Sequence, residues 1–234
     1  MQMDDERIRY AVSQTEVLKH PKQSLSTFGT TVVDYFLLTE PVYSEIEDAA
    51  REETVVREGK VSSEKPRVVT PYYLTRLEGF GENARKYLET IIDRYGQHAP
   101  GVLYSYRNET KGLSIVSDRL DIVAGRLNDK IETEGSNLVA IIKGVDDLWD
   151  VSLLKFISEL TEGSLRKNMA ELGGGGLLQV DKAGIPFEAR LHIESLFHRV
   201  ARGECDPSEL KRELDLWDIF SHYEDRFLNL FRTP

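Results

Sequence analysis

The hydrophobic pattern changes its period near the middle of the chain, from about two residues to between three and four. The run from Thr30 to Leu38 is apolar on nearly both faces, which is typical of a strand at the centre of a sheet. From Ser117 onward, apolar residues recur at helical spacing almost to the end. This change predicts an α+β fold in which a small mixed or antiparallel sheet with one or two helices precedes a helical region of about five helices.

Shorter segments of the first half show weaker signals. Residues 8–12 alternate between apolar and polar side chains, and this spacing predicts a strand. Residues 54–62 and 67–74 are also predicted as strands. Because Pro71 has no N–H group to donate, the second of these should lie at the edge of a sheet or carry a bulge. Residues 41–53 are acidic and are expected to form a surface excursion.

A helix followed by a β-hairpin is predicted between residues 82 and 116. The helix should cover residues 82–95, because Gly96 is a suitable stop. Its apolar stripe consists of Ala84, Tyr87, Leu88, Ile91, Ile92 and Tyr95. Segments 102–106 and 113–115 are expected to be the arms of the hairpin, with residues 108–112 as the loop between them.

The predicted helices of the second half begin at recognisable start signals. The first should follow a cap at Ser117, the second should begin near Ser136, and the third near Asp150. Pro186 opens a further helix. Residues 206–209, Asp-Pro-Ser-Glu, combine an N-cap, a proline and an acid, which indicates the start of a last helix or pair of helices. The apolar stripe expected for the first helix is Leu120, Val123, Leu127 and Ile131.

The glycine run at residues 173–176 is interpreted as a joint rather than a phosphate-binding loop. A phosphate-binding loop needs a preceding strand and a lysine directly after its last glycine. Here a predicted helix precedes the run, and Leu177 and Leu178 follow it. Gly173 suits the position just after the end of that helix.

The length of 234 residues suits one large domain or two small ones. The change of period predicts an α+β, sheet-containing domain at residues 1–116. It predicts a helical domain at residues 117–234, with the glycine joint at 173–176 inside it.

Charge and cysteine content narrow the expected partners and location. The net charge is −10, and no run of basic residues stands out, so nucleic acid is an unlikely partner and an anionic membrane is disfavoured. The single cysteine, Cys205, excludes an internal disulfide. No segment has the apolar length of a signal peptide or a membrane span, so we expect a cytoplasmic protein that does not bind membranes.

Residues 146–150, Asp-Asp-Leu-Trp-Asp, raise the question of a metal site. This pattern resembles the aspartate-rich motif of prenyl-diphosphate enzymes, a resemblance that implies magnesium and a diphosphate ligand. No second such motif follows in the chain, and the five histidines are not spaced as metal ligands. We therefore expect Asp146 and Asp147 to be solvated turn residues and Asp150 to cap the next helix. No metal and no cofactor are predicted.

Tyrosine and arginine occur together in the first half, and such side chains can stack on and pair with ligands. The alternative is that they belong to ordinary amphipathic strands. The candidate ligand-binding residues are Tyr72, Arg76, Tyr104, Tyr106 and Arg107.

The last 50 residues are rich in aromatic side chains at helical spacing, while catalytic motifs are not recognisable. These features favour a protein-interaction or regulatory module without catalytic activity, binding a protein partner or a second copy of the chain. The candidate interaction residues are Trp217, Phe220, Tyr223 and Phe227. The alternative function is an enzyme or sensor that binds a small molecule between the sheet and the helical half.

Overall fold

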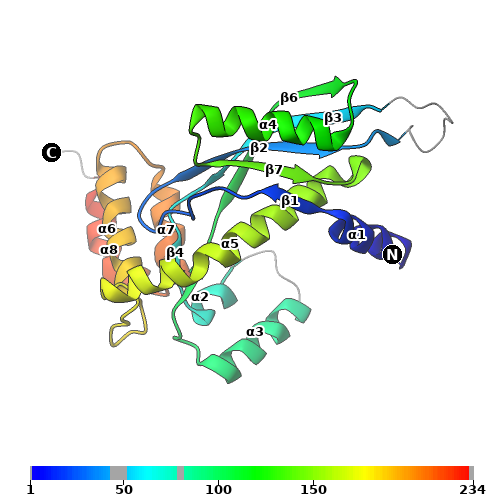
Figure 1. Cartoon of the computed structure of the whole chain (residues 1–234). Helices are drawn as coiled ribbons and strands as arrows, with labels where there is room; N and C mark the ends of the chain where they lie inside the picture. Colours follow the sequence, from blue (N-terminus) through cyan, green and yellow to red (C-terminus); the bar gives the residue numbers. More distant parts are fainter. Residues whose placement is uncertain (1, 43–51, 78–81, 232–234) are drawn as a thin grey trace. The chain divides into compact units, whose positions relative to one another are not determined.

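The computed structural model describes residues 2–42, 52–77 and 82–231. The chain forms two compact units, and each contains segments from distant parts of the sequence (Figure 1). Unit 1 comprises Met1–Lys65 and Tyr104–Asn168, and unit 2 comprises Pro66–Leu103 and Met169–Pro234. The α+β class is confirmed. Most of the predicted acidic excursion at residues 41–53 lies outside the described residues.

Unit 1 is built on a mixed five-stranded sheet with the order β1-β7-β2-β3-β6. The central strand β2 pairs in parallel with β7 and antiparallel with β3, and β6 and β1 pair antiparallel at the two edges. The predicted central position of residues 30–38 is therefore confirmed. The strands are β1 (Glu16–Lys19), β2 (Thr31–Thr39), β3 (Thr54–Ser63), β6 (Tyr106–Val116) and β7 (Val139–Lys143).

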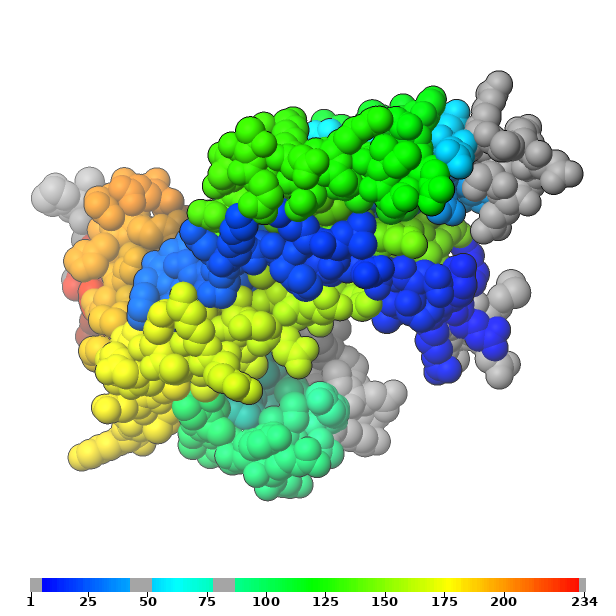
Figure 2. Space-filling view, viewed as in Figure 1, coloured from blue at the N-terminus to red at the C-terminus, as the bar shows by residue number. Residues whose placement is uncertain are grey.

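Two helices cover the opposite faces of this sheet (Figure 1). Helix α4 (Leu120–Glu134) packs on one face through the predicted stripe, and α5 (Trp149–Gly174) packs on the other. In the space-filling view, the green surface, which includes α4, lies beside the blue surface of the N-terminal segment (Figure 2). Strand β7 supplies both cores, with Val139 and Ile141 towards α4 and Ala140 and Ile142 towards α5.

Burial on both faces explains why β7 was predicted wrongly as the start of a helix at Ser136. A strand that is covered on both faces is a short apolar run without alternation, and a buried helix segment has the same appearance in sequence. Ser136 instead follows the end of α4, where Gly135 has a left-handed conformation with φ 67°.

The strand predicted at residues 8–12 is also wrong, because these residues belong to helix α1 (Gln2–Gln14). The alternating Ile8, Tyr10 and Val12 are exposed, while Ala11 between them is fully buried. The alternation of polarity therefore does not mark a buried face.

The hairpin predicted between residues 102 and 115 does not form. Residues 106–116 are one continuous strand, β6, which pairs along its length with β3, and Lys111 is the extra residue of a bulge. The first predicted arm is divided, because β5 (Gly101–Leu103) pairs with β4 (Arg67–Val69) in a separate two-stranded sheet of unit 2. The backbone N–H and C=O groups of residues 106–116 form hydrogen bonds with β3. In a hairpin, the same groups would have bonded to each other.

Pro71 ends a strand and begins a helix. The strand predicted over residues 67–74 is shortened to β4, and α2 (Pro71–Thr75) follows it. The Thr70 side chain accepts a hydrogen bond from the Tyr73 amide, and Pro71 occupies the first helical position, where no N–H is needed.

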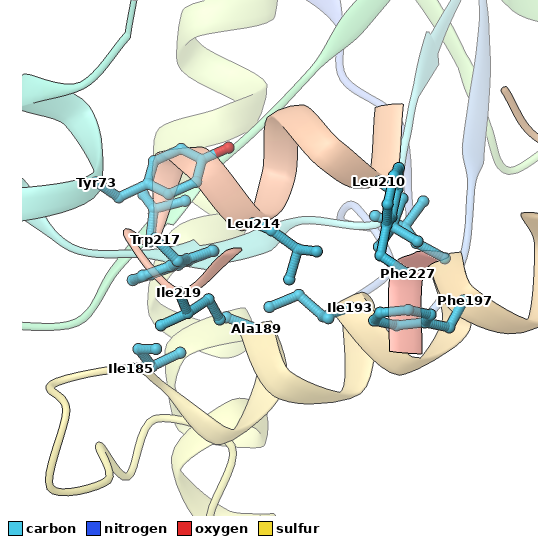
Figure 3. Packing of buried hydrophobic residues seen from close by; sticks show 12 residues of the cluster. Tyr73, Ile185, Ala189, Ile193, Phe197, Leu210, Leu214, Trp217, Ile219 and Phe227 are labelled. Atoms are coloured by element: carbon cyan, nitrogen blue, oxygen red, sulfur yellow. The ribbon is translucent and has the colours of Figure 1, made fainter. Parts of the chain in front are cut away.

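Unit 2 is mainly helical. Helices α2, α3 (Glu82–Tyr95), α6 (Phe187–Ala201), α7 (Pro207–Leu216) and α8 (Phe220–Asn229) accompany the small sheet. The predicted bounds of α3 and the predicted cap of α7 are confirmed, since Asp206 accepts a hydrogen bond from the Ser208 amide at 2.8 Å. Side chains from α2, α6, α7 and α8 form one apolar core (Figure 3).

The glycine run ends a helix, as predicted, but the position of the cap differs. Helix α5 continues through Gly173 and Gly174, and Gly176 has φ +72°. The Gly176 amide donates to the Gly173 carbonyl at 3.0 Å, and the Leu177 amide donates to the Leu172 carbonyl at 2.9 Å. These two bonds define a glycine cap at Gly176 instead of Gly173.

The predicted division into domains 1–116 and 117–234 concerns independent folding and stays a prediction. In the structure, residues from both sides of that boundary contribute to both compact units. Across the described residues, no helix is both long and apolar enough to span a membrane.

Candidate functional site

The candidate site is a pocket of unit 1 at the carboxyl ends of the parallel strands β2 and β7. We call it the β2–β7 pocket. Its volume is about 380 Å³, which lies within the usual range of ligand sites. In sheets with parallel strands, ligands commonly bind outside the carboxyl ends of those strands. The lining residues are Arg7, Tyr10, Gln14, Glu40, Pro41, Val42, Leu120, Lys143, Gly144, Val145, Asp146 and Asp147.

The turn from β7 into α5 is held against the end of β2. The Gly144 amide donates to the Leu38 carbonyl at 2.9 Å. A Cβ atom on Gly144 would lie 2.5 Å from the Ser152 hydroxyl, so the close packing of this turn requires glycine. The Ser152 hydroxyl is buried and accepts hydrogen bonds from the Thr15 hydroxyl at 2.7 Å and the Val145 amide at 3.4 Å.

Asp146 makes a largely buried ion pair with Arg57. Their N and O atoms are 2.7 Å apart, and the side chains are 18% and 16% exposed, respectively. The Thr39 hydroxyl also donates to Asp146 at 2.7 Å, and the Arg57 guanidinium lies 5.8 Å from the centre of the Trp149 ring. The prediction that Asp146 is a solvated turn residue is therefore wrong. The carboxylate of Asp146 is paired with Arg57 on β3, which is 89 residues away in sequence.

The other two aspartates of the pattern behave differently. Asp147 pairs with Arg7 at 2.6 Å, and both side chains are about half exposed, as expected for a solvated position. Asp150 lies inside the first turn of α5, which begins at Trp149, so the prediction that it is the N-cap is wrong. Within the described parts of the chain, no cluster of three or more acidic, histidine or cysteine side chains could hold a metal ion.

Two charged residues of the pocket have no ion-pair partner in the ranges that the structure describes. Lys143 ends β7, Glu40 follows β2, and both are exposed. Among the described residues, neither side chain enters an ion pair, whereas Arg7, Asp146 and Asp147 are all paired. Within the described part of the chain, the pocket therefore contains one ammonium and one carboxylate group that have no ion-pair partner.

The five predicted ligand residues fall into two groups, one in each unit. In unit 2, the Arg76 guanidinium lies over the Tyr72 ring at 5.3 Å, and both side chains bind Asp218, at 2.9 and 3.2 Å respectively. The structure thus shows how these two residues contact each other, and their predicted ligand role stays a prediction.

The second group lies in unit 1. The rings of Tyr104 and Tyr106 are nearly parallel, with centroids 6.3 Å apart. Burial raises the pKa of both hydroxyls, and the Tyr106 hydroxyl is hydrogen-bonded to Thr161. Arg107 is well exposed and lies near Glu109. A ligand could reach Arg107 more easily than the two tyrosine rings.

The predicted interaction residues belong to the core of unit 2 (Figure 3). Trp217 and Phe227 are buried, and Phe220 and Tyr223 pack against the same core. The Trp217 indole N–H donates to Glu213 at 3.0 Å. These aromatic side chains pack in their own unit, and Trp217 and Phe227 have little surface left for a partner.

Glu213 is the centre of a buried polar network beside this core. Its carboxylate pairs with the Arg67 guanidinium and accepts a hydrogen bond from the Tyr73 hydroxyl at 3.2 Å. Burial, and next the negative charge of Glu213, raise the pKa of Tyr73. The network pairs the Glu213 carboxylate with three donors, whereas the buried Nε of Arg67 has no hydrogen-bond partner among the described residues.

Sequence reasoning did not identify Arg7, Glu40 or Lys143. A usable signal was present in residues 139–147, where a short β-branched run ends in Lys-Gly-Val-Asp-Asp. If this run is read as a strand followed by a turn, polar residues fall at a strand end, where sites are common.

Comparison of the chain with protein-family models, curated proteins and solved structures finds no match.

Proposed function

We propose that the protein is a sensor or regulatory module that binds a small polar molecule with an anionic group in the β2–β7 pocket. The observation that carries this proposal is Lys143, an ammonium group without an ion-pair partner in the described chain, at the carboxyl end of a parallel strand pair. A carboxylate or phosphate group would form charge-assisted hydrogen bonds with it. Glu40 would accept a hydrogen bond from a donor on the same ligand.

The proposal includes no reaction. The paired aspartates and Arg57 maintain the shape of the pocket, and the proposed recognition depends on Lys143 and Glu40. A ligand that binds only the folded protein raises its stability, by about 2.7 kcal/mol at a concentration 100 times the dissociation constant.

The test is a thermal-shift screen with glutamate, citrate, inorganic phosphate and adenosine monophosphate, followed by calorimetric titration of any compound that raises Tm. Lys143→Gln should weaken binding by about 10- to 100-fold, the effect of losing a hydrogen bond to a charged group. Lys182→Gln is the matched control, because Lys182 is exposed and lies outside the pocket. Equal binding by the wild type and Lys143→Gln would refute the proposal.

A protein-interaction function through Trp217, Phe220, Tyr223 and Phe227 is the leading expectation from sequence, and we keep it as a second proposal because the burial of Trp217 and Phe227 weakens its support. The net charge of −10 keeps nucleic acid an unfavourable partner. A cytoplasmic location stays part of the proposal, supported by the single cysteine.

A further inference from the structure

Strand β6 is an edge of the unit 1 sheet, and its two halves differ in chemistry. It pairs only with β3, and no described strand lies on its other side (Figure 1). An edge strand presents unpaired backbone donors and acceptors that another strand can use.

The first half of β6 is protected against such pairing. It carries the charged residues Arg107, Glu109 and Lys111, and Lys111 forms the bulge. Glu109 pairs with Lys60 at 3.0 Å, and Lys111 pairs with Asp34. Charged side chains and bulges are the usual features that block edge-to-edge pairing.

The second half, Gly112–Val116, has no charged residue. Leu113 and Ile115 are 62% and 54% exposed. They are two residues apart on the strand, so both lie on the same face of the sheet.

We propose that residues 112–116 of two copies of this chain pair antiparallel across a two-fold axis at Ser114. This register sets Leu113 of each copy opposite Ile115 of the other, so apolar side chains meet twice. Within residues 112–116, this register sets no charged residue opposite another.

The neighbouring registers are less favourable. An axis at Leu113 would set the bulge residue Lys111 opposite the apolar Ile115. An axis at Ile115 would set Leu113 opposite Ser117, which lies beyond the end of β6 at Val116. An axis at Lys111 would set that lysine against itself. The position of Lys111 and the end of β6 at Val116 therefore favour the axis at Ser114. The exposed Leu113 and Ile115 meet each other twice about this axis, which favours a second copy of the chain as the partner.

The interface is small, so the dimer should be weak, with a dissociation constant on the order of 10–100 μM. The first measurement is sedimentation velocity of the full chain between 5 and about 500 μM, a range chosen to span that constant. A wild-type protein that is monomeric throughout would overturn the proposal. This test does not involve the β2–β7 pocket and does not depend on the proposed ligand.

The second measurement tests the register by exchanging charges. Leu113→Glu and Ile115→Lys should each raise the dissociation constant at least tenfold. The double variant should restore it to within about threefold, because the introduced opposite charges face each other across the axis. Leu154→Lys is the control, since Leu154 is an exposed leucine on α5 and should have no effect.

Circular dichroism should show that each variant keeps the wild-type secondary structure. Ile115→Thr preserves strand propensity and replaces Ile115→Lys if the latter unfolds. Dimers that survive both single substitutions, or a double variant as weak as the singles, would overturn the proposal.

Discussion

At the scale of single residues, the ion pair between Asp146 and Arg57 connects three parts of unit 1. Asp146 belongs to the turn after β7, Arg57 to β3, and Thr39, which donates to the same carboxylate, to β2. A charge that is removed from water needs a partner at close range, because an unpaired buried ion costs several kcal/mol. The cluster therefore holds Asp146, which lines the pocket together with Lys143 and Glu40, against β2 and β3.

We predict that Asp146→Ala lowers the free energy of unfolding by about 2–3 kcal/mol, because it leaves Arg57 without its partner in a largely buried position. Asp147→Ala is the neighbouring control, and it should cost at most about 1 kcal/mol because its pair with Arg7 is exposed. Urea denaturation of the two variants measures the difference. Equal losses would contradict the assignment of Asp146 to the buried pair.

At the scale of elements, the end of α5 shows how one glycine differs from its neighbours. Gly174 lies within the helix, and a Cβ atom there would meet no other group within 4 Å. Gly176 has φ +72° and completes the helix cap. Only the second position needs the conformational freedom of glycine.

We predict opposite effects from alanine at these two positions. Gly176→Ala should destabilise the protein by about 1 kcal/mol, because L-residues pay this cost in the left-handed region. Gly174→Ala should be neutral or should stabilise by up to about 0.5 kcal/mol through better helix propensity. Differential scanning calorimetry would detect shifts of Tm in opposite directions, and a loss of the same size in both variants would contradict this account of the cap.

At the scale of the whole molecule, the described residues form separate cores in the two units. The apolar cluster of unit 2 surrounds Trp217 and Leu214, while unit 1 has one cluster on each face of its sheet. The Glu213 network belongs to unit 2 alone, where it joins α7 to β4 and α2.

We predict that Glu213→Gln destabilises unit 2 by about 3 kcal/mol, because Arg67 loses its counter-charge in a mostly buried site. Hydrogen exchange should then lose protection in α6, α7 and α8 more than in β2 and β7. Glu209→Gln, an exposed change on the same helix, is the control. A uniform loss across both units would contradict a local role of the network.

The elements that sequence predicted well are those with local signals. The stripe of α4 and the Asp206 cap of α7 depend on residues within one or two turns. Residues 139–143 were misread because burial on both faces removes the alternation on which a strand prediction depends. The hairpin failed because the competing partner, β3, begins about 50 residues earlier in the chain.

The sequence by itself determined the α+β class, the central position of β2 and the starts of α3, α6 and α7, because periodicity and capping act between neighbouring residues. Only the tertiary structure decided that β7 lies beside β2, that Asp146 meets Arg57, and that the C-terminal aromatic side chains face their own core. These contacts join residues that are far apart in the chain. Each segment has backbone hydrogen bonds to form, apolar surface to bury and charges to pair, and the local sequence does not say which distant segment provides them. The β2–β7 pocket belongs to this second group, because Glu40 and Lys143 become neighbours only through the parallel pairing of their strands.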